Sequence, residues 1–344
     1  MVDWNLVRTK IDLKFWFGIA ISLFFMVLLF RKIDFNSLWS ALVRVDYRYI
    51  LLAVVCTFVS YFLRAIRWHY LLIPEKRIPL SSLYPATIIG YMANNLLPAR
   101  LGEFVRAFVL AQQEGLQTPT VFASLVIDRL FDGFTVMLIL LFTLFTLRLP
   151  QGMSEAETVL RTGGVVTFIL YAGVVVFLFV LKHQTIRTLA WTGVLLKPFP
   201  QQLSNRIIPL LGSFIGGIRI SSNGGHLAAI LVSSIAVWLF CVIPVDMVLQ
   251  GFGIHLPITA SMFILVLLVF AVMVPASPGF IGTYHYACFR GLSAFGIPES
   301  TAVSIALVLH GTAFFPVIIA GFYYLWQSKM SFKGLRSAGS RVGN

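Results

Sequence analysis

The fold is decided by residues 258–282, which read ITASMFILVLLVFAVMVPASPGFIG. The stretch opens with an uncharged apolar run, long enough for a helix that crosses the hydrocarbon core of a membrane. Pro275 and Pro278 prevent this helix from continuing, while Gly279 and Gly282 allow close approach of the backbone. Irregular backbone at membrane depth is tolerated only where it is buried in protein or lines a watery cavity. The stretch therefore predicts a helical membrane protein with a functional break.

The composition of the whole chain points the same way. Its 344 residues are 58% hydrophobic and 11% charged, whereas globular chains have about 45 to 50% and about 25%. With a mean hydropathy of +0.89, too few polar side chains are present to cover a water-facing surface. We expect a single integral membrane domain over residues 1–344, with an all-α fold that forms a polytopic bundle of transmembrane helices.

The charge balance is basic, with 26 Lys and Arg against 13 Asp and Glu and a net charge of +13. In a membrane protein this excess reflects basic loops held on the cytoplasmic side. We therefore expect membrane lipids with anionic headgroups as partners, and no nucleic acid. Cys56, Cys241 and Cys288 lie in apolar stretches without metal-like spacing, so we predict no disulfide framework, no metal and no cofactor.

The apolar runs predict seven clear membrane spans, near residues 13–30, 49–72, 119–147, 163–181, 226–250, 258–275 and 300–326. Two shorter pieces, near 83–112 and 276–296, are interrupted by Pro and Gly, and both re-entrant hairpins and full crossings fit them. We expect the run near 13–30 to be retained, because no small-residue cleavage site follows it. Basic loops place the C-terminus in the cytoplasm, which predicts a multi-pass protein of the cell (inner) membrane.

An internal repeat is suggested by PARLG at residues 98–102, which is echoed by PGFIG at residues 278–282. Both patterns follow an apolar run, and both precede a short amphipathic helix that ends before a proline and a long span. The charge count places the start of the first unit on the cytoplasmic side of the membrane and the start of the second unit on the outer side. We predict two inverted repeats with broken or re-entrant helices, at approximately 83–147 and 258–326.

The first break reads NNLLPARLGEFVR over residues 94–106. A helix that starts just after the proline directs free backbone amides and its positive dipole end toward the break. Arginine adds fixed charge, and its planar guanidinium suits phosphate. We predict a site for an anionic headgroup formed by Asn94, Asn95, Pro98, Arg100, Gly102, Glu103 and Arg106. The structural alternative is that the arginines reach the membrane interface and that Glu103 pairs with Arg106.

Three charged residues, Asp128, Arg129 and Asp132, lie at the start of a long apolar span, with the two carboxylates on one helical face. A charge at the bilayer centre costs about 3 kcal/mol on insertion scales, so all three must face protein, water or headgroups. We expect Arg129 to pair with Asp132 or with Glu103. A structural charge network and a gating element both fit this pattern.

Arg64 and Arg67 lie near the expected cytoplasmic end of the second span, beside Trp68 and Tyr70. We favour an interfacial anchor with an aromatic belt for these arginines. The alternative is that they contribute to a phosphate pocket.

The second break adds polar groups to the predicted headgroup site. Ser277 and Thr283 can cap a helix or coordinate a ligand, and the other predicted site residues of this break are Pro278, Gly279 and Gly282. His285 is the group of this break that titrates nearest neutral pH, and His310 in the last span could meet it. A proton-coupling or gating role fits the two histidines, and so does an ordinary hydrogen-bonding role.

Motifs of soluble enzymes are absent from the sequence, including the Gly-x-Ser-x-Gly elbow, the Walker loop, the His-Glu-x-x-His pair and the dinucleotide fingerprint. We therefore favour a transporter and expect no enzyme. One alternative is a membrane-embedded transferase that uses lipid-linked sugar donors, with Asp128, Asp132 or Glu103 as the base. Another is a non-transporting partner of a lipid-modifying enzyme.

Taken together, residues 95–106, 128–132 and 275–283 resemble the motifs of the lysylphosphatidylglycerol synthase transmembrane region family, also called flippase-like membrane proteins. The resemblance covers roughly residues 15–327 and implies a multi-pass bacterial or archaeal cell-membrane protein. Members fused to a synthetase domain carry aminoacylated phosphatidylglycerol between leaflets, and some relatives are named as glycosyltransferases or hopanoid-linked proteins. Many members have Glu where this chain has His285, so the role of that carboxylate is not carried over.

We expect the broken helices to meet near the midplane of the membrane and to form a polar groove between them. A phospholipid or polyprenyl-phosphate headgroup would slide through this groove while the acyl tails stay in the bilayer. The expected function is therefore that of a lipid translocase, in which Asp128, Arg129 and Asp132 hold or gate the site.

Overall fold

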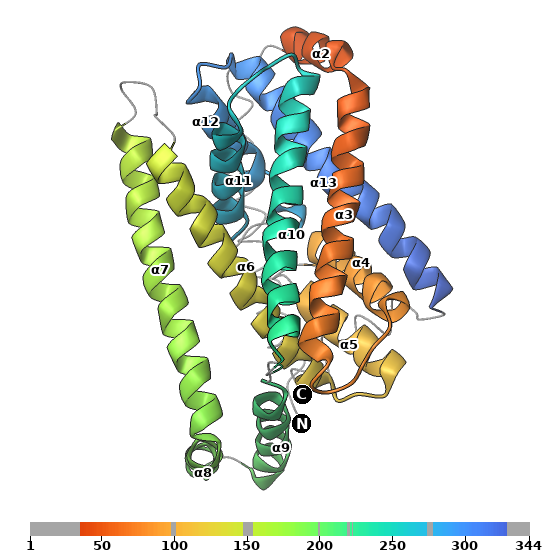
Figure 1. The fold of residues 1–344 in the computed structure, drawn as a ribbon, viewed down its shortest axis with the longest axis vertical. Coiled ribbons are helices and arrows are strands. Elements are labelled where there is room, and N and C mark those ends of the chain that lie inside the picture. Colours follow the sequence, from red (N-terminus) through yellow and green to blue (C-terminus); the bar gives the residue numbers. More distant parts are fainter. Residues whose placement is uncertain are drawn as a thin grey trace.

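The computed structural model describes residues 35–97, 101–146, 154–198, 200–218, 221, 223–273 and 278–328. Within these ranges the chain forms helices and no strand, which confirms the predicted all-α fold (Figure 1). The helices are α2 (Phe35–Arg44), α3 (Tyr47–Leu72), α4 (Leu80–Leu96), α5 (Gly102–Glu114), α6 (Thr118–Thr146), α7 (Ser154–His183), α8 (Thr185–Leu195), α9 (Gln201–Gly217), α10 (Gly224–Gly251), α11 (Ile258–Met273), the short 3₁₀-helix η2 (Pro278–Phe280), α12 (Thr283–Ser293) and α13 (Glu299–Gln327).

Four described helices are long and apolar enough to cross a membrane: α3, α10, α13 and the part of α7 from Thr162 to His183. The protein is therefore a multi-pass membrane protein. Helix α6 is as long as α13, with 29 residues, but it carries the predicted charge cluster. Helix α11 has 16 residues, about 24 Å at the helical rise. The span predicted near 13–30 and the C-terminal tail lie outside the described residues.

Both predicted breaks are present. The first separates α4 from α5, and the second separates α11 from α12. In each unit a helix is followed by a break, a short helix and a helix of 29 residues. The short helices of the first unit lie toward one end of the molecule and those of the second toward the other, while α6 and α13 run in opposite senses (Figure 1). An inverted symmetry relation between the two units stays a prediction.

Two hydrophobic cores accompany the two units. One joins residues of α3, α4, α5 and the first half of α6, and also takes in Leu325 from the end of α13. The other joins residues of α10, α11, α12 and the first half of α13, and takes in Met137 and Leu140 from the second half of α6. Each long helix therefore starts in the core of its own unit and ends in that of the other, which ties the two breaks into one bundle.

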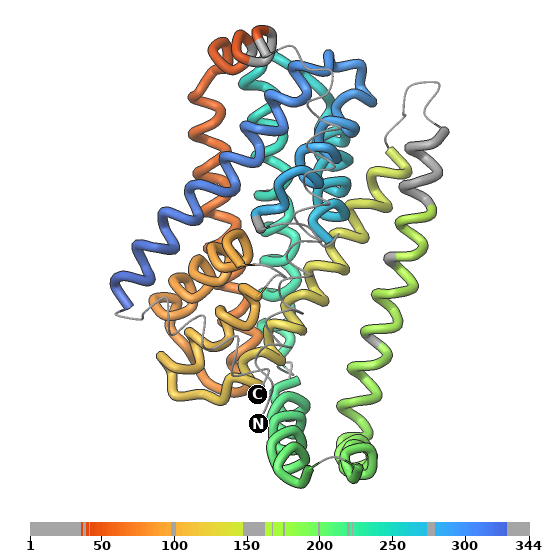
Figure 2. The backbone as a smooth tube through the Cα atoms, turned by 180° about the vertical axis from the view of Figure 1, so that it is seen from behind, coloured from red at the N-terminus to blue at the C-terminus, as the bar shows by residue number. Residues whose placement is uncertain are grey.

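The connection between α7 and α10 contains two helices. Helix α8 lies across the direction of α7 and is seen end-on in Figure 1. Helix α9 packs closely against the start of α6, because a Cβ atom on Gly217 would lie 2.7 Å from the carbonyl oxygen of Thr120. The tube in Figure 2 shows α7 along one side of the bundle and α8 and α9 at its lower end.

Candidate functional site

The centre of the site is supplied by one face of α3. Arg64 and Arg67 are three residues apart and share a helical face with Trp68. All three are buried, with exposures of 6% for Arg64 and 0% for Arg67 and Trp68. The favoured interpretation of the two arginines as interfacial anchors is therefore wrong, because their guanidinium groups point into the protein rather than toward the headgroup layer.

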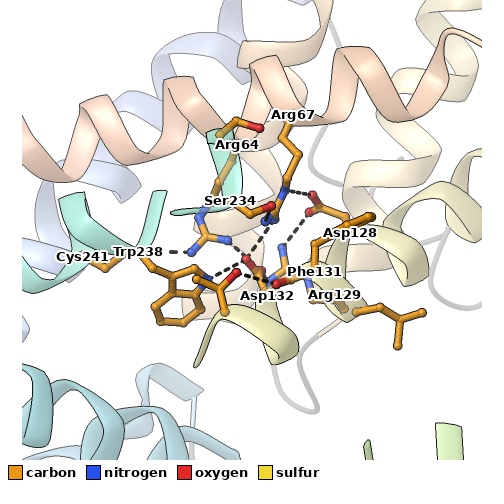
Figure 3. A network of polar contacts seen from close by, with 12 residues as sticks. Arg64, Arg67, Asp128, Arg129, Phe131, Asp132, Ser234, Trp238 and Cys241 are labelled. Carbon is orange, nitrogen blue, oxygen red and sulfur yellow. Dashed lines mark hydrogen bonds and ion pairs between the residues drawn. The ribbon is translucent and has the colours of Figure 1, made fainter. Parts of the chain in front are cut away.

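Both arginines pair with the carboxylates of α6 (Figure 3). Arg67 places Nε 2.7 Å from Oδ1 of Asp128 and Nη2 2.9 Å from Oδ1 of Asp132. Arg64 places Nη1 2.8 Å from Oδ2 of Asp132. The two aspartates share one face of α6, as their spacing of four residues predicts, and so can receive two arginines from one neighbouring helix.

Helix α10 closes the same site with neutral hydrogen-bonding groups. Trp238 donates from Nε1 to Oδ1 of Asp132 at 3.0 Å, and Arg67 donates to the hydroxyl of Ser234 at 3.2 Å (Figure 3). Arg64 also lies 5.5 Å from the ring centroid of Trp238. These contacts satisfy the ions in an apolar interior, where an unpaired polar group costs roughly 1 to 3 kcal/mol.

Arg106 reaches the network from α5, next to the first break. Its Nη1 lies 3.3 Å from Oδ2 of Asp128, and its guanidinium lies over the Trp68 ring at 4.0 Å from the centroid. The side chain is buried, with 1% exposure, yet its Nε and Nη2 atoms have no hydrogen-bond partner among the described residues. The described part of the chain therefore satisfies Arg106 only in part.

Arg129 forms the exposed side of the network. It pairs with Asp132 at 2.9 Å, with Asp128 at 3.3 Å and with Glu103 at 3.4 Å, and it donates to the hydroxyl of Tyr91 at 3.0 Å. The prediction that Arg129 pairs with Asp132 or Glu103 is confirmed for both partners. The alternative pairing of Glu103 with Arg106 is not observed. The Arg129 side chain is 37% exposed, and Oε2 of Glu103 has no hydrogen-bond partner within the described ranges.

The ions of this network do not balance. Four arginines, from α3, α5 and α6, face three carboxylates, from α5 and α6, which leaves one positive charge among the described members. A buried charge without a partner is strongly unfavourable. The described members of the network therefore carry one more positive than negative charge.

Two glycines let α4 and α5 approach each other beside this network. A Cβ atom on Gly102 would collide with the carbonyl oxygen of Gly90, and one on Gly90 would lie 2.7 Å from Cβ of Arg106. The amide of Gly102 donates to Oδ1 of Asn94 at 2.8 Å. Asn94 thus holds the start of α5, which begins at Gly102 rather than directly after the proline. Pro98 and Arg100 lie outside the described residues.

The second break is built around a short 3₁₀-turn. Gly279 and Gly282 have φ of 74° and 96°, values that favour glycine. Thr283 is buried and donates its hydroxyl proton to the carbonyl of Phe280 at 3.3 Å, so its polar group serves the turn. Ser277 lies outside the described residues.

The two predicted histidines meet, as expected. Nδ1 of His310 lies 3.1 Å from Nε2 of His285. The amide of Gly282 donates to Nδ1 of His285 at 3.3 Å, and the ring of His310 is hydrogen-bonded to the backbone of Gly279. His285 has 4% exposure, so the pair belongs to the interior of the second unit.

The two breaks lie against each other. A Cβ atom on Gly279 would lie 2.8 Å from the ring of Phe314 and 3.7 Å from the carbonyl oxygen of Asn95. Residues of the first break thus stand next to residues of the second, although about 180 positions separate them in the sequence. No cluster of three His, Cys, Asp or Glu that could hold a metal ion occurs among the described residues.

The arrangement of charged, broken helices in an all-helical membrane protein agrees with comparisons to known families. The family described as lysylphosphatidylglycerol synthase TM region matches residues 15–321. The chain belongs to this family. No solved structure matches it significantly.

Its relatives include proteins with and without an enzyme name. A UPF0104 membrane protein of Methanothermobacter thermautotrophicus is 24% identical over 82% of this chain and 86% of its own length. The UPF0104 membrane protein PH1989 of Pyrococcus horikoshii is 22% identical over 84% of this chain and 90% of its own length. Glycosyltransferase AglD of Haloferax volcanii is 26% identical over 88% of this chain, which spans 53% of that protein. The expectation that the chain is not an enzyme is therefore unsupported.

Proposed function

We propose that this protein moves a lipid with an anionic headgroup between the two leaflets of its membrane. The observation that carries the proposal is the unbalanced arginine network, in which two nitrogen atoms of the buried Arg106 side chain have no partner in the part of the chain that the structure describes. A phosphate group supplies the missing negative charge and accepts several hydrogen bonds from guanidinium groups. Phospholipids and polyprenyl phosphates share this chemistry.

The proposed route starts at the exposed side of the network. Arg129 is the member with substantial exposure, and the Glu103 carboxylate beside it is partly unsatisfied. A headgroup that displaces Glu103 from Arg129 would gain a second guanidinium at Arg106 and the N-terminal amides of α5. Asn95 and the second break line the continuation of this route, because Gly279 contacts that part of the first break.

The remaining members of the network have a supporting role in this proposal. Asp128 accepts from Arg67, Arg106 and Arg129, and Asp132 accepts from Arg64, Arg67 and Arg129. They hold several guanidinium groups within a few ångströms of each other despite their repulsion. The carboxylates would thus keep the phosphate site assembled while the headgroup enters and leaves.

Leaflet exchange in sealed proteoliposomes tests the proposal. The probes are fluorescent phosphatidylglycerol, a fluorescent polyprenyl phosphate and, as the zwitterionic reference, fluorescent phosphatidylcholine. We expect the wild type to exchange an anionic probe faster than the reference, and Arg129→Gln to slow this exchange roughly tenfold, because a charge-assisted contact contributes about 1.5 to 3 kcal/mol. Arg129→Gln leaves Arg67 and Arg106 on Asp128, so the fold should persist.

The matched control is Arg187→Gln, which removes an exposed arginine of α8 and should not change the rate. Equal thermal stability of the two variants in detergent would confirm that folding is not the cause. Exchange of every anionic probe at the rate of protein-free vesicles would contradict the proposal, as would equal losses in both variants.

A second candidate function is a membrane-embedded sugar transferase, which is favoured by the relative named as a glycosyltransferase. Among the network carboxylates, Glu103 has an oxygen atom to which no described residue donates a hydrogen bond, so it is the best candidate for a base. A transferase would consume a lipid-linked sugar donor in detergent, where no leaflets exist, and Glu103→Gln would abolish this turnover. A non-transporting partner of a lipid-modifying enzyme would show neither activity alone.

A further inference from the structure

We propose that the pair of His285 and His310 is a proton-binding site whose protonation releases the second break, so that headgroup movement is coupled to proton binding. The coupling rests on the proposed function, while the proton site itself stands on the geometry of the pair. Its basis is a chain of hydrogen bonds from Gly282 through both rings to Gly279.

The direction of this chain follows from the backbone at its start. An amide can only donate, so Nδ1 of His285 accepts from Gly282 and the proton of a neutral ring sits on Nε2. This Nε2–H then donates to Nδ1 of His310 across 3.1 Å. The other ring nitrogen of His310 carries the second proton and can donate to the carbonyl of Gly279. The whole chain is satisfied in one tautomer of each ring, with both rings uncharged.

Adding one proton breaks this chain at a defined place. A protonated imidazole donates from both nitrogen atoms, so a proton on His285 sets an N–H group against the amide of Gly282. A proton on His310 sets an N–H group against the donating Nε2 of His285. In either case one hydrogen bond of the chain is lost and two donors face each other, so the bound proton and the closed break are mutually exclusive.

The lost hydrogen bond matters for the fold of the second break. Gly282 caps α12 without a side chain of its own, and His285 occupies the third helical position, from which a side chain can satisfy the amide of the cap residue. Gly279, at the other end of the chain, packs on Phe314 and lies next to Asn95. Protonation would thus loosen the start of α12 and the contact between the two breaks together.

Among the described side chains packed around the two histidines, the imidazole rings are the basic groups, so an added proton binds there. Tyr284 stacks on His310 with ring centroids 4.9 Å apart, and Phe314 lies edge-on at 5.3 Å. The other titratable groups nearby are Cys288 on α12 and Tyr61 on α3, both close to Tyr284. No described carboxylate, lysine or arginine forms an ion pair or hydrogen bond with either ring, and Arg290 on α12 is exposed.

Amide hydrogen exchange of the purified protein tests the proton site without any transport. We expect the amides of residues 282–286, after correction for intrinsic exchange, to lose protection about tenfold or more between pH 8 and pH 5. His285→Gln should remove this pH dependence and keep the helix start, since glutamine can also satisfy the cap amide from this position. The control His255→Gln alters an exposed loop histidine and should behave as the wild type.

The leaflet assay then tests the coupling. Anionic probe exchange by the wild type should rise as the pH falls, and exchange by His285→Gln should not depend on pH. A pH-dependent break without any exchange would leave the proton site standing and refute the translocase. Protection of residues 282–286 that is independent of pH in the wild type, or equally pH-dependent in His285→Gln, would overturn the proton site.

Discussion

The two breaks occupy the same position in the order of helices, but one adjoins charged side chains and the other adjoins two imidazole rings. The first adjoins a network of permanent charges, in which every aspartate oxygen pairs with at least one arginine. The second is closed by two imidazoles in contact with each other and with the backbone. Permanent ions are tolerated at depth only with counter-ions, whereas a histidine can remain uncharged. This contrast underlies our two proposals, in which the first break holds an anion and the second responds to a proton.

The substitution with the largest expected effect removes a carboxylate from the ionic network beside the first break. Asp128→Asn keeps the shape of the side chain but leaves Arg67, Arg106 and Arg129 without their shared carboxylate. We expect the free energy of unfolding in detergent to fall by about 3 to 5 kcal/mol, the typical cost of breaking a buried pair. Denaturant titration followed by circular dichroism measures this loss.

The matched control for that substitution is Asp246→Asn. Asp246 accepts from Gln250 at 2.6 Å and from Ser261 at 3.2 Å, and it forms no ion pair with a described arginine. Its replacement should cost about 1 kcal/mol, as for an ordinary hydrogen bond. If Asp128→Asn costs no more than Asp246→Asn, the network is not the stabilising element described above.

Two glycine substitutions with intermediate expected effects compare how tightly the two breaks are packed. Gly102→Ala sets a Cβ atom against the backbone of Gly90, which cannot move aside, and should destabilise the protein by about 2 to 3 kcal/mol. Gly279→Ala meets the movable ring of Phe314 but needs a positive φ, which costs about 1 to 2 kcal/mol. Thermal unfolding in detergent ranks the two variants. Gly173→Ala, with open space at its Cβ position, is the control, and the reverse ranking would contradict this account.

The smallest expected effect concerns an ion pair at the surface, between Lys76 and Glu114. Lys76 donates to the carboxylate of Glu114 at 2.8 Å, and hydrogen bonds from Lys76 and Ser82 hold the pKa of Glu114 below its ordinary value. The pair therefore stabilises the fold above the unfolded glutamate pKa, about 4.3, and this contribution is lost as the pH falls through the lower folded pKa.

A double-mutant cycle of Lys76→Met and Glu114→Gln, followed by thermal unfolding between pH 3 and pH 7, measures the coupling energy between these two side chains. We expect a coupling below about 1 kcal/mol at pH 7, because Lys76 is well exposed, and none at pH 3. A coupling energy as large as that within the Asp128 network would show that burial does not strengthen an ion pair in this protein.

Much of the candidate site could be predicted from local sequence. Pro and Gly within apolar runs located both breaks, and the spacing of Asp128 and Asp132 predicted a shared helical face. The contact between His285 in the second break and His310 in the last span was also predicted, and the structure confirms it. In each case the signal is local, since prolines interrupt helices and buried polar groups in a membrane need partners.

The role of α3 could not be predicted from the sequence. Arg64 and Arg67 have the same spacing and aromatic neighbours as an interfacial anchor, and their partners lie 61 to 68 residues further along the chain. A local pattern cannot state which helix packs on which. One signal was available: two arginines three apart and two aspartates four apart form complementary helical faces.

A helical membrane protein with two interrupted segments follows from the amino-acid sequence alone, because hydropathy and helix-breaking residues act over a few turns of chain. The burial of Arg64 and Arg67, the incomplete pairing of Arg106 among the described residues and the contact between the two breaks are visible only in the folded chain. These features depend on the packing of α3, α5, α6 and α10, where the energy of a charge is set by groups distant in sequence and near in space.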